Sequence, residues 1–273
     1  MHKLSAVIIT YNEEANIGRC IESVRAVADE IIVLDSFSTD HTVAIAQSLG
    51  ARVYQEKFRG YIGQKNLAIR YASYDHILSL DADEALDSTL VQSILEAKED
   101  FTHAAYRIRR CTNYCGRYIR HGLWYPDPKI RLFSRRKARW GGLNPHDRIL
   151  LPPGTPVKKL KGNILHYSFR TPEDLVWQNN RLSSIAASSL YAHGRKSSWF
   201  KMTIRPAWAF LNGYFLRLGF LDGADGFTIA VNTAHQVFLK YSKLYRLQRL
   251  QQRTAAPLKP VIAETKPAAG DAW

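Results

Sequence analysis

The sequence has few cysteines and no long apolar segment. Its three cysteines are Cys20, Cys111 and Cys115. An odd number of cysteines without a secretory leader does not suggest a disulfide framework, and the spacing of Cys111 and Cys115 does not match a CxxC zinc knuckle. No uninterrupted apolar run approaches the roughly 20 residues that a membrane-spanning helix needs. We therefore predict unpaired cysteines in a reducing compartment and no spanning helix.

The first residues also lack the features of a signal peptide. They read MHKLSAVIITYNEE, in which a short apolar run ends in polar residues and not at a small-residue cleavage site. This pattern predicts a strand. We therefore expect the protein to stay on the cytoplasmic side of the membrane.

Acidic residues are scarce after residue 100. Residues 1–100 carry 9 Lys and Arg against 16 Asp and Glu, whereas the remaining residues carry 29 against 8. A partner of the later part should be anionic. The basic residues are scattered and form no nucleic-acid reading motif, so we expect no nucleic acid. The segment WFKMTIRPAWAFLNGYFLRLGF is typical of interfacial helices, which predicts a helical membrane-associating region at 196–250 on an anionic membrane surface.

Apolar periodicity in the first 100 residues predicts alternating strands and helices. Two runs rich in β-branched residues, at 4–10 and 30–35, are typical of buried parallel strands. Between them, apolar residues at three- and four-residue spacing predict an amphipathic helix. The pattern repeats with strands at 52–55 and 76–80 and helices at 40–50 and 61–72. We therefore predict an α/β fold with a mostly parallel sheet and helices on both faces.

The residue pattern changes after the first 100 residues. From about residue 104, aromatic and basic residues alternate as in hairpin strands. A helix is expected at 172–193, beginning after Thr171 with Glu173 and Asp174 in its first turn. The composition of the last residues predicts a disordered tail at 251–273.

Polar side chains follow three of the predicted strands. The segments are Thr10-Tyr11-Asn12-Glu13, Asp35-Ser36 and Asp81-Ala82-Asp83. Open parallel sheets bind ligands at the carboxyl ends of their strands, so we expect these side chains in one cleft. In an extended strand end Asp81 and Asp83 point the same way, and carboxylates suit Mg²⁺ or Mn²⁺. The alternative is an acidic turn that caps a helix beginning near Asp87.

The order of several segments is informative. The segments are VIITYNEEANI at 7–17, VLDSFSTDHTVAIA at 33–46, GQKNLAI at 63–69 and LSLDADE at 78–84. Together they resemble the family 2 glycosyltransferases of the GT-A fold. Later segments, which are RLFSRRKARW, NPHDRI, the His166-Tyr167 pair and GFLDGADGF, resemble the bacterial lipopolysaccharide-core β-glucosyltransferase group. The resemblance implies a Rossmann-like GT-A catalytic domain at 1–195, with a nucleotide-sugar half at 1–100 and an acceptor half at 101–195.

The resemblance also implies a donor site. Its residues are Thr10, Tyr11, Asn12 and Glu13 along the nucleotide, Asp35 at the base, Asp81 with Ala82 at the ribose, and Asp83 at a divalent metal, Mg²⁺ or Mn²⁺. A carboxylate acceptor suits a pyrimidine imide, which favours a UDP-linked donor. Lys65 is a candidate to meet the diphosphate, and its alternative is a solvated helix lysine.

The catalytic base implied by the resemblance is Asp147, in Pro145-His146-Asp147, where family members carry an acidic residue. The alternative is a loop-capping or salt-bridging aspartate. His146 is a candidate to orient the base. His166 is a candidate to approach the metal or diphosphate, or else a hydrogen-bonding histidine on a strand.

Two aromatic residues are candidates for the acceptor side. Trp124 and Tyr125 have flat faces that suit stacking on sugar rings, and simple packing beside Pro126 is the alternative.

These residues lead to one functional hypothesis. One base without a second carboxylate nucleophile fits a single in-line displacement, which inverts the anomeric centre. We predict an inverting, metal-dependent hexosyltransferase that acts on a lipid-linked saccharide such as the lipopolysaccharide inner core, at the inner face of the bacterial inner membrane. Alternatives are transfer to a polyprenyl-phosphate carrier or exopolysaccharide intermediate, and a non-catalytic protein that binds nucleotide sugars or nucleic acid.

Overall fold

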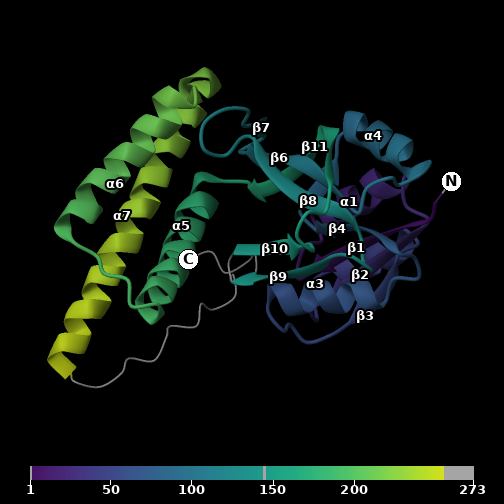
Figure 1. The fold of residues 1–273 in the computed structure, drawn as a ribbon, viewed down its shortest axis with the longest axis horizontal. Helices are drawn as coiled ribbons and strands as arrows, with labels where there is room; N and C mark the ends of the chain where they lie inside the picture. Colours follow the sequence, from purple (N-terminus) through teal and green to yellow (C-terminus); the bar gives the residue numbers. More distant parts are fainter. Residues whose placement is uncertain (1, 144–145, 255–273) are drawn as a thin grey trace. The chain divides into compact units, whose positions relative to one another are not determined.

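The computed structural model describes residues 2–143 and 146–254, apart from the side chains of residues 143, 146 and 252–254. The chain forms two compact units (Figure 1). The first contains the chain up to Thr112 together with Pro126–Tyr167. The second contains Asn113–Tyr125 and the chain from Ser168 onward. Of the tail predicted as disordered at 251–273, residues 251–254 are helical, so the prediction is wrong for them; the rest lies outside the described residues.

The first unit begins with the predicted parallel strands. They are β1 (Leu4–Thr10), β2 (Glu30–Asp35), β3 (Arg52–Gln55) and β4 (His76–Asp81), in the spatial order β3-β2-β1-β4. The connecting helices are α1 (Ile17–Val24), α2 (Thr42–Ser48) and α3 (Tyr61–Arg70). These elements confirm the predicted alternation. The continuous apolar runs fold as strands because both faces of this sheet are covered.

Residues of β1 alternate between two apolar clusters. Leu4, Ala6 and Ile8 lie in one cluster, which also contains buried residues of α1, α2 and α4 (Ser88–Lys98). Val7 lies in the other cluster, with residues of α3. Figure 1 shows α4 and α3 on opposite sides of the strands. The prediction of helices on both faces is confirmed.

The prediction of a mostly parallel sheet is wrong. Among the residues that the structure describes, the sheet has nine strands and is mixed, and beyond β4 its order is β8-β6-β11-β5 with β7 paired to β6. β8 is antiparallel to β4 and to β6, and β11 is antiparallel to β5. The added strands are β5 (Glu84–Leu86), β6 (Ala105–Tyr114), β7 (Arg117–Tyr118), β8 (Asp127–Ser134) and β11 (Val157–Phe169). The alternating segments predicted as hairpin strands pair with the edge of the parallel sheet. Because they are antiparallel, the whole sheet is mixed.

A second, two-stranded sheet completes the first unit. It consists of β9 (Arg139–Leu143) and β10 (His146–Leu150), which pair antiparallel. In their register Asp147 lies opposite Gly142, and Ile149 lies opposite Trp140. Trp140 and Ile149 are buried in the same cluster as α3. This hairpin therefore holds residue 147 beside α3.

The second unit is mainly helical, with helices α5 (Pro172–Ala192), α6 (Trp199–Leu211) and α7 (Gly223–Thr254). A π-helical turn (Asn212–Leu216) and a 3₁₀ turn (Gly219–Asp222) join α6 to α7. Thr171 and Asp174 form a capping box at the start of α5, as expected for the helix predicted at 172–193. Within the described residues, no helix has the length and apolar character to cross a membrane.

A carboxylate near the amino end of β1 should make the stability of the first unit depend on pH. Burial raises the pKa of Asp29, but ion pairs with Lys98 (2.6 Å) and Lys3 (2.9 Å) and the N–H of Leu4 outweigh it and lower the pKa to about 2. The stabilisation is therefore complete above the unfolded pKa of about 3.9 and is lost as the pH falls toward the folded value.

Between pH 5 and pH 2, the unfolding free energy of the Asp29→Asn variant should fall by about 1 to 2 kcal/mol less than that of the natural chain, after allowance for solvent screening. Urea denaturation at stepped pH measures this difference. The exposed Asp100→Asn change should leave the pH profile unaltered. Parallel profiles for the natural chain and Asp29→Asn would contradict the assignment.

Candidate active site

Three parallel strands end in polar residues at the same edge of the sheet. In the register, Thr10 of β1 lies beside Asp35 of β2, and Ile9 lies beside Asp81 of β4. Sheets of this kind bind ligands outside the carboxyl ends of their strands. The structure therefore brings together the strand ends at which the sequence predicted a site.

The loop after β1 is tied to the segment after β2. Asn12 has a left-handed backbone with φ of 52°. Its N–H donates to Ser38 Oγ (2.8 Å), and its side-chain oxygen accepts from the N–H of Thr39 (2.8 Å). The N–H of Glu13 donates to Thr42 Oγ1 (2.8 Å). These bonds fix the backbone of the residues predicted to line the nucleotide.

Asp35 is fully buried under this loop. Its carboxylate accepts from the N–H and the hydroxyl of Ser38 and from Gln55 Nε2 (3.0 Å). A carboxylate has about four acceptor positions, so Asp35 keeps capacity for one further donor. Nearby, Thr10 Oγ1 is buried without a hydrogen-bond partner among the described residues, and Tyr11 is exposed. The exposed side chain of Tyr11 is therefore available to a ligand at this edge.

Asp81 lies between two buried cations at the end of β4. Its Oδ1 is 3.0 Å from Lys65 Nζ, and its Oδ2 is 3.1 Å from Arg131 Nη2. The side chains of Lys65 and Arg131 are each only 4% exposed. Burial alone would raise the pKa of Asp81, but the charges of the two cations hold it well below its usual range. Asp81 is therefore a fixed anion.

Lys65 also contacts Asp147. Its Nζ lies 2.9 Å from Asp147 Oδ2 and 4.4 Å from the centre of the Trp140 ring. The alternative of a solvated helix lysine is therefore wrong. Asp147 forms the salt bridge that was the alternative to its role as base, and its side chain is 20% exposed, so solvent reaches it. Lys65 thus joins the predicted base to the predicted ribose-binding aspartate.

Glu84 and Arg131, the charged residues next to Asp81 in this network, were not predicted from the sequence. Glu84 Oε1 lies 2.7 Å from Arg131 Nη2, and Glu84 Oε2 accepts from the N–H of Asp81 (3.0 Å). The side chain of Glu84 is fully buried. The sequence contains features that could have identified both residues: Glu84 directly follows Asp81-Ala82-Asp83, and Arg131 lies in the RLFSRR segment. What the sequence lacked was the pairing of β8 with β4, which places Arg131 beside both acids.

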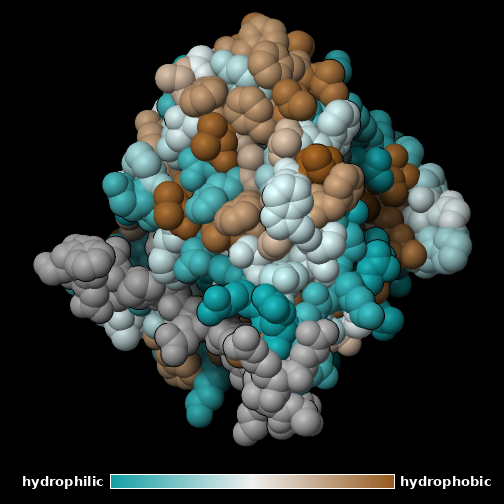
Figure 2. All heavy atoms as spheres, turned by 90° about the vertical axis from the view of Figure 1, so that its left-hand side faces the viewer, coloured by the Kyte–Doolittle hydropathy of each residue, from teal (hydrophilic) through white to brown (hydrophobic). Residues whose placement is uncertain are grey.

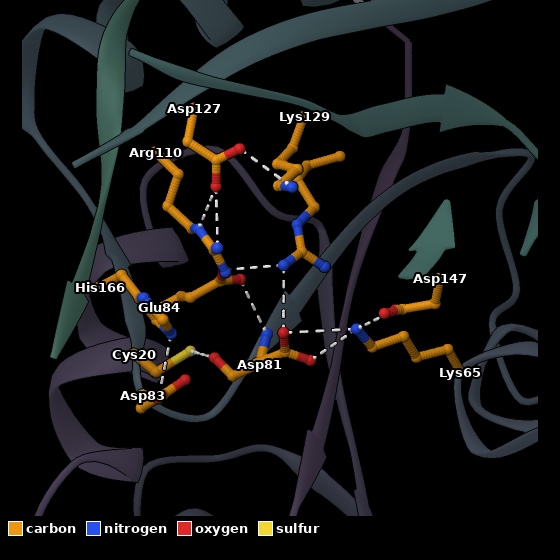
Figure 3. Close-up of polar contacts among 11 residues, drawn as sticks. Cys20, Lys65, Asp81, Asp83, Glu84, Arg110, Asp127, Lys129, Asp147 and His166 are labelled. Atoms are coloured by element: carbon orange, nitrogen blue, oxygen red, sulfur yellow. Dashed lines mark hydrogen bonds and ion pairs between the residues drawn. The ribbon is translucent and has the colours of Figure 1, made fainter. Parts of the chain in front are cut away.

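Asp83 faces a different partner from Asp81. Residues 82–83 form a turn between β4 and β5, so the expected extended geometry of Asp81 and Asp83 is wrong. Asp83 Oδ2 lies 3.3 Å from Nε2 of His166, which sits on β11 (Figure 3). Ala82 is buried, and its N–H donates to the carbonyl of Ile9 (3.2 Å). The structure thus joins His166 to the aspartate predicted to bind the metal.

The donor atoms at Asp83 fit a cation that arrives with a nucleotide. No three His, Cys, Asp or Glu side chains lie together as a metal site in residues 2–143 and 146–254. Mg²⁺ is usually held by one or two carboxylates plus substrate phosphates and water. The carboxylate of Asp83 matches this partial ligand set, and the ring nitrogen of His166 lies beside it.

Three predicted residues remain, and two of them, Trp124 and Tyr125, belong to the second unit. Trp124 belongs to the second unit, where its ring stacks on Phe169 with centroids 5.0 Å apart and meets the Tyr114 ring edge to face. These contacts fit the packing alternative. Tyr125 belongs to the same unit and is partly buried. The His146 side chain lies outside the described residues.

Comparison with known proteins agrees with these features. Residues 5–151 match the family model described as Glycosyl transferase family 2. A glycosyltransferase of Rickettsia typhi is 36% identical over 90% of this chain and 88% of its own. The lipopolysaccharide core biosynthesis glycosyltransferase LpsC of Rhizobium meliloti is 31% identical over 92% of this chain and 94% of its own.

Among solved structures, glucosyl-3-phosphoglycerate synthase of Mycobacterium tuberculosis, in complex with Mn²⁺, UDP and glucosyl-3-phosphoglycerate, is 26% identical over 42% of this chain and 45% of its own, with a TM-score of 0.34. The family match over residues 5–151 and the two relatives that align along most of their length are sufficient: the chain is a glycosyltransferase and belongs to glycosyl transferase family 2.

Proposed function

We propose that this glycosyltransferase moves a hexose from a UDP-linked donor to a lipid-linked saccharide such as the inner core of lipopolysaccharide. The relative from Rhizobium meliloti supports the class of acceptor. The free acceptor capacity of buried Asp35 supports a pyrimidine donor, because the base imide carries an N–H that needs an acceptor. A polyprenyl-phosphate carrier and an exopolysaccharide intermediate are the alternative acceptors.

One observation carries the proposal: Lys65 links the carboxylates of Asp81 and Asp147 at the carboxyl edge of the parallel strands. Asp147 accepts the proton of the acceptor hydroxyl. The hydroxyl oxygen then bonds to the anomeric carbon on the face opposite the diphosphate, and the bond from this carbon to the diphosphate oxygen breaks. Such an in-line displacement inverts the anomeric centre and needs only one base.

Other residues hold the donor in place for this step. The backbone from Thr10 to Glu13 lines the nucleotide, and Asp81, fixed by Lys65 and Arg131, accepts from the ribose hydroxyls. Asp83 and His166 would hold a divalent cation. Such a cation would stabilise, by several kcal/mol, the negative charge on the departing diphosphate. We propose that the enzyme works at the inner face of the bacterial inner membrane.

A nucleotide-release assay tests the proposal. We expect UDP release from a UDP-hexose when a glycolipid extract is present, and its loss on addition of a chelator. The Asp83→Asn variant should lower this rate about 10²-fold or more. It would weaken binding of the cation that stabilises the negative charge on the departing diphosphate. The matched, exposed Asp100→Asn variant should keep the rate of the natural chain.

Each other outcome of this assay has a definite meaning. No release with any donor and any extract would favour a module that binds nucleotide sugars without turnover. Release that survives chelation, with Asp83→Asn equally active, would refute the metal assignment. Retention of DNA or RNA at high salt would favour a nucleic-acid partner for the basic part.

A further inference from the structure

One side of α6 exposes a stripe of large apolar residues. The exposed residues are Phe200, Ile204, Trp208, Leu211 and Phe215, which recur at three- and four-residue spacing along α6 and the π-helical turn. This spacing places them on one face of the helix. No residue of α6 is fully buried, and Phe200 and Trp208 are 65% and 58% exposed. This side of α6 is therefore turned to solvent.

The turn that follows continues this apolar surface. Its exposed residues are Leu216, Leu218, Phe220 and Leu221, and Phe227 and Val231 extend the surface onto α7. Figure 2 looks onto the side on which α6 and α7 lie in Figure 1 and shows hydrophobic residues gathered across the upper part of that face. We name the stripe on α6 and the turn at 215–221 together the apolar face. Soluble proteins rarely expose contiguous apolar patches of this kind without an interaction partner.

The turn at 215–221 is closely packed and is followed by a hydrogen-bonded anchor. Gly219 lies so close to the preceding π-helical turn that an added Cβ would stand 2.6 Å from the carbonyl oxygen of Gly213. Directly after the turn, the buried carboxylate of Asp222 accepts from the N–H groups of Arg120 (3.1 Å) and His121 (2.8 Å). The 3₁₀ turn is thus anchored by polar bonds while its apolar side chains stay outside. An exposed surface that is fixed in this way suits a partner that it meets without refolding.

The charge around the apolar face identifies the partner. Residues 195–221 contain five Lys and Arg and no Asp or Glu. Arg217 lies exposed within the turn itself, between Leu216 and Leu218. Aromatic and aliphatic side chains beside basic residues are typical of helices that lie in the headgroup region of anionic membranes. A second copy would bring the same positive charge against itself, which disfavours self-association.

We propose that the apolar face inserts into the boundary between headgroups and acyl chains of an anionic lipid bilayer, with Arg217 and its basic neighbours on the lipid phosphates. The proposal makes specific the membrane surface at which the lipid-linked acceptor of the proposed function would be met. Vesicle binding needs neither donor nor acceptor, so its failure and the failure of sugar transfer are distinguishable.

Flotation of the full chain with lipid vesicles tests this proposal. We expect the chain to float with vesicles of phosphatidylglycerol and phosphatidylethanolamine and to remain below with phosphatidylcholine alone. The double change Leu216→Glu and Phe220→Glu should reduce the bound fraction about tenfold or more. The matched control is Val176→Glu on α5, an equally exposed apolar residue outside the apolar face, which should float normally. UDP binding in solution should be equal for all three chains.

A second pair of variants tests the role of charge. Arg217→Gln should weaken flotation and its salt dependence, whereas the exposed Lys158→Gln in the first unit should not. Flotation that is equal on neutral and anionic vesicles, or unaffected by Leu216→Glu with Phe220→Glu, would overturn the proposal. So would a dimer in light scattering that these changes convert to a monomer without any vesicle binding, because a second copy would then occupy the face.

Discussion

The Asp147→Asn variant is expected to turn over about 10² to 10⁴ times more slowly than the natural chain, with donor binding nearly unchanged. Asparagine keeps the size of the side chain but cannot accept the proton of the acceptor hydroxyl. The neighbouring Lys65 retains its contact with Asp81, so the donor side of the site keeps its charge arrangement. Steady-state UDP release gives kcat, and calorimetric titration of UDP gives donor affinity.

The pattern of the two measurements matters more than either alone. Asp100→Asn removes an exposed aspartate elsewhere in the chain and should change neither value. If Asp147→Asn lowered donor affinity and kcat equally, Asp147 would act only as the salt-bridge partner of Lys65. Full activity of Asp147→Asn would assign the base to another carboxylate.

The Arg131→Met variant is expected to lose about 3 to 5 kcal/mol of unfolding free energy, the largest effect on stability that we predict. Arg131 is the cation between Asp81 and Glu84, and the Glu84 side chain is fully buried. Methionine fills much of the space but leaves the buried Glu84 carboxylate without its nearest positive charge. Urea denaturation followed by circular dichroism measures the loss.

Two further variants separate charge from packing. Arg131→Lys keeps the positive charge but lacks the planar guanidinium that donates to both carboxylates. Its loss of unfolding free energy should therefore be measurable but smaller than that of Arg131→Met. Arg136→Met removes an arginine whose side chain is 76% exposed and paired with Asp75, and it should change stability by about 1 kcal/mol or less. Equal stability of Arg131→Met and Arg136→Met would show that the buried network contributes little.

The parallel half of the fold was predictable because its signals are local. The apolar runs of β1 and β2 and the spacing of Ile17, Cys20 and Ile21 on α1 each lie within one element. The antiparallel half was only partly predictable. Its strands were expected as hairpins, but nothing in the spacing of residues 105–134 says that β8 pairs with β4, which lies some fifty residues earlier.

The same limit applies to the site. Asp81, Asp147 and Lys65 could be selected one at a time from motifs, but their mutual contacts depend on how β10 and α3 pack around Trp140. Arg131 was missed because its role arises only from sheet pairing. The directions of Asp81 and Asp83 were wrongly expected because a turn at 82–83 replaces the extended strand end.

Hydrogen–deuterium exchange with and without UDP and Mn²⁺ tests most directly whether the strand ends form the donor site. We expect new protection in three separate segments, at residues 10–13, 35–39 and 81–84, with no comparable change in α6 or α7. Protection confined to the second unit, or no protection at saturating nucleotide, would contradict it.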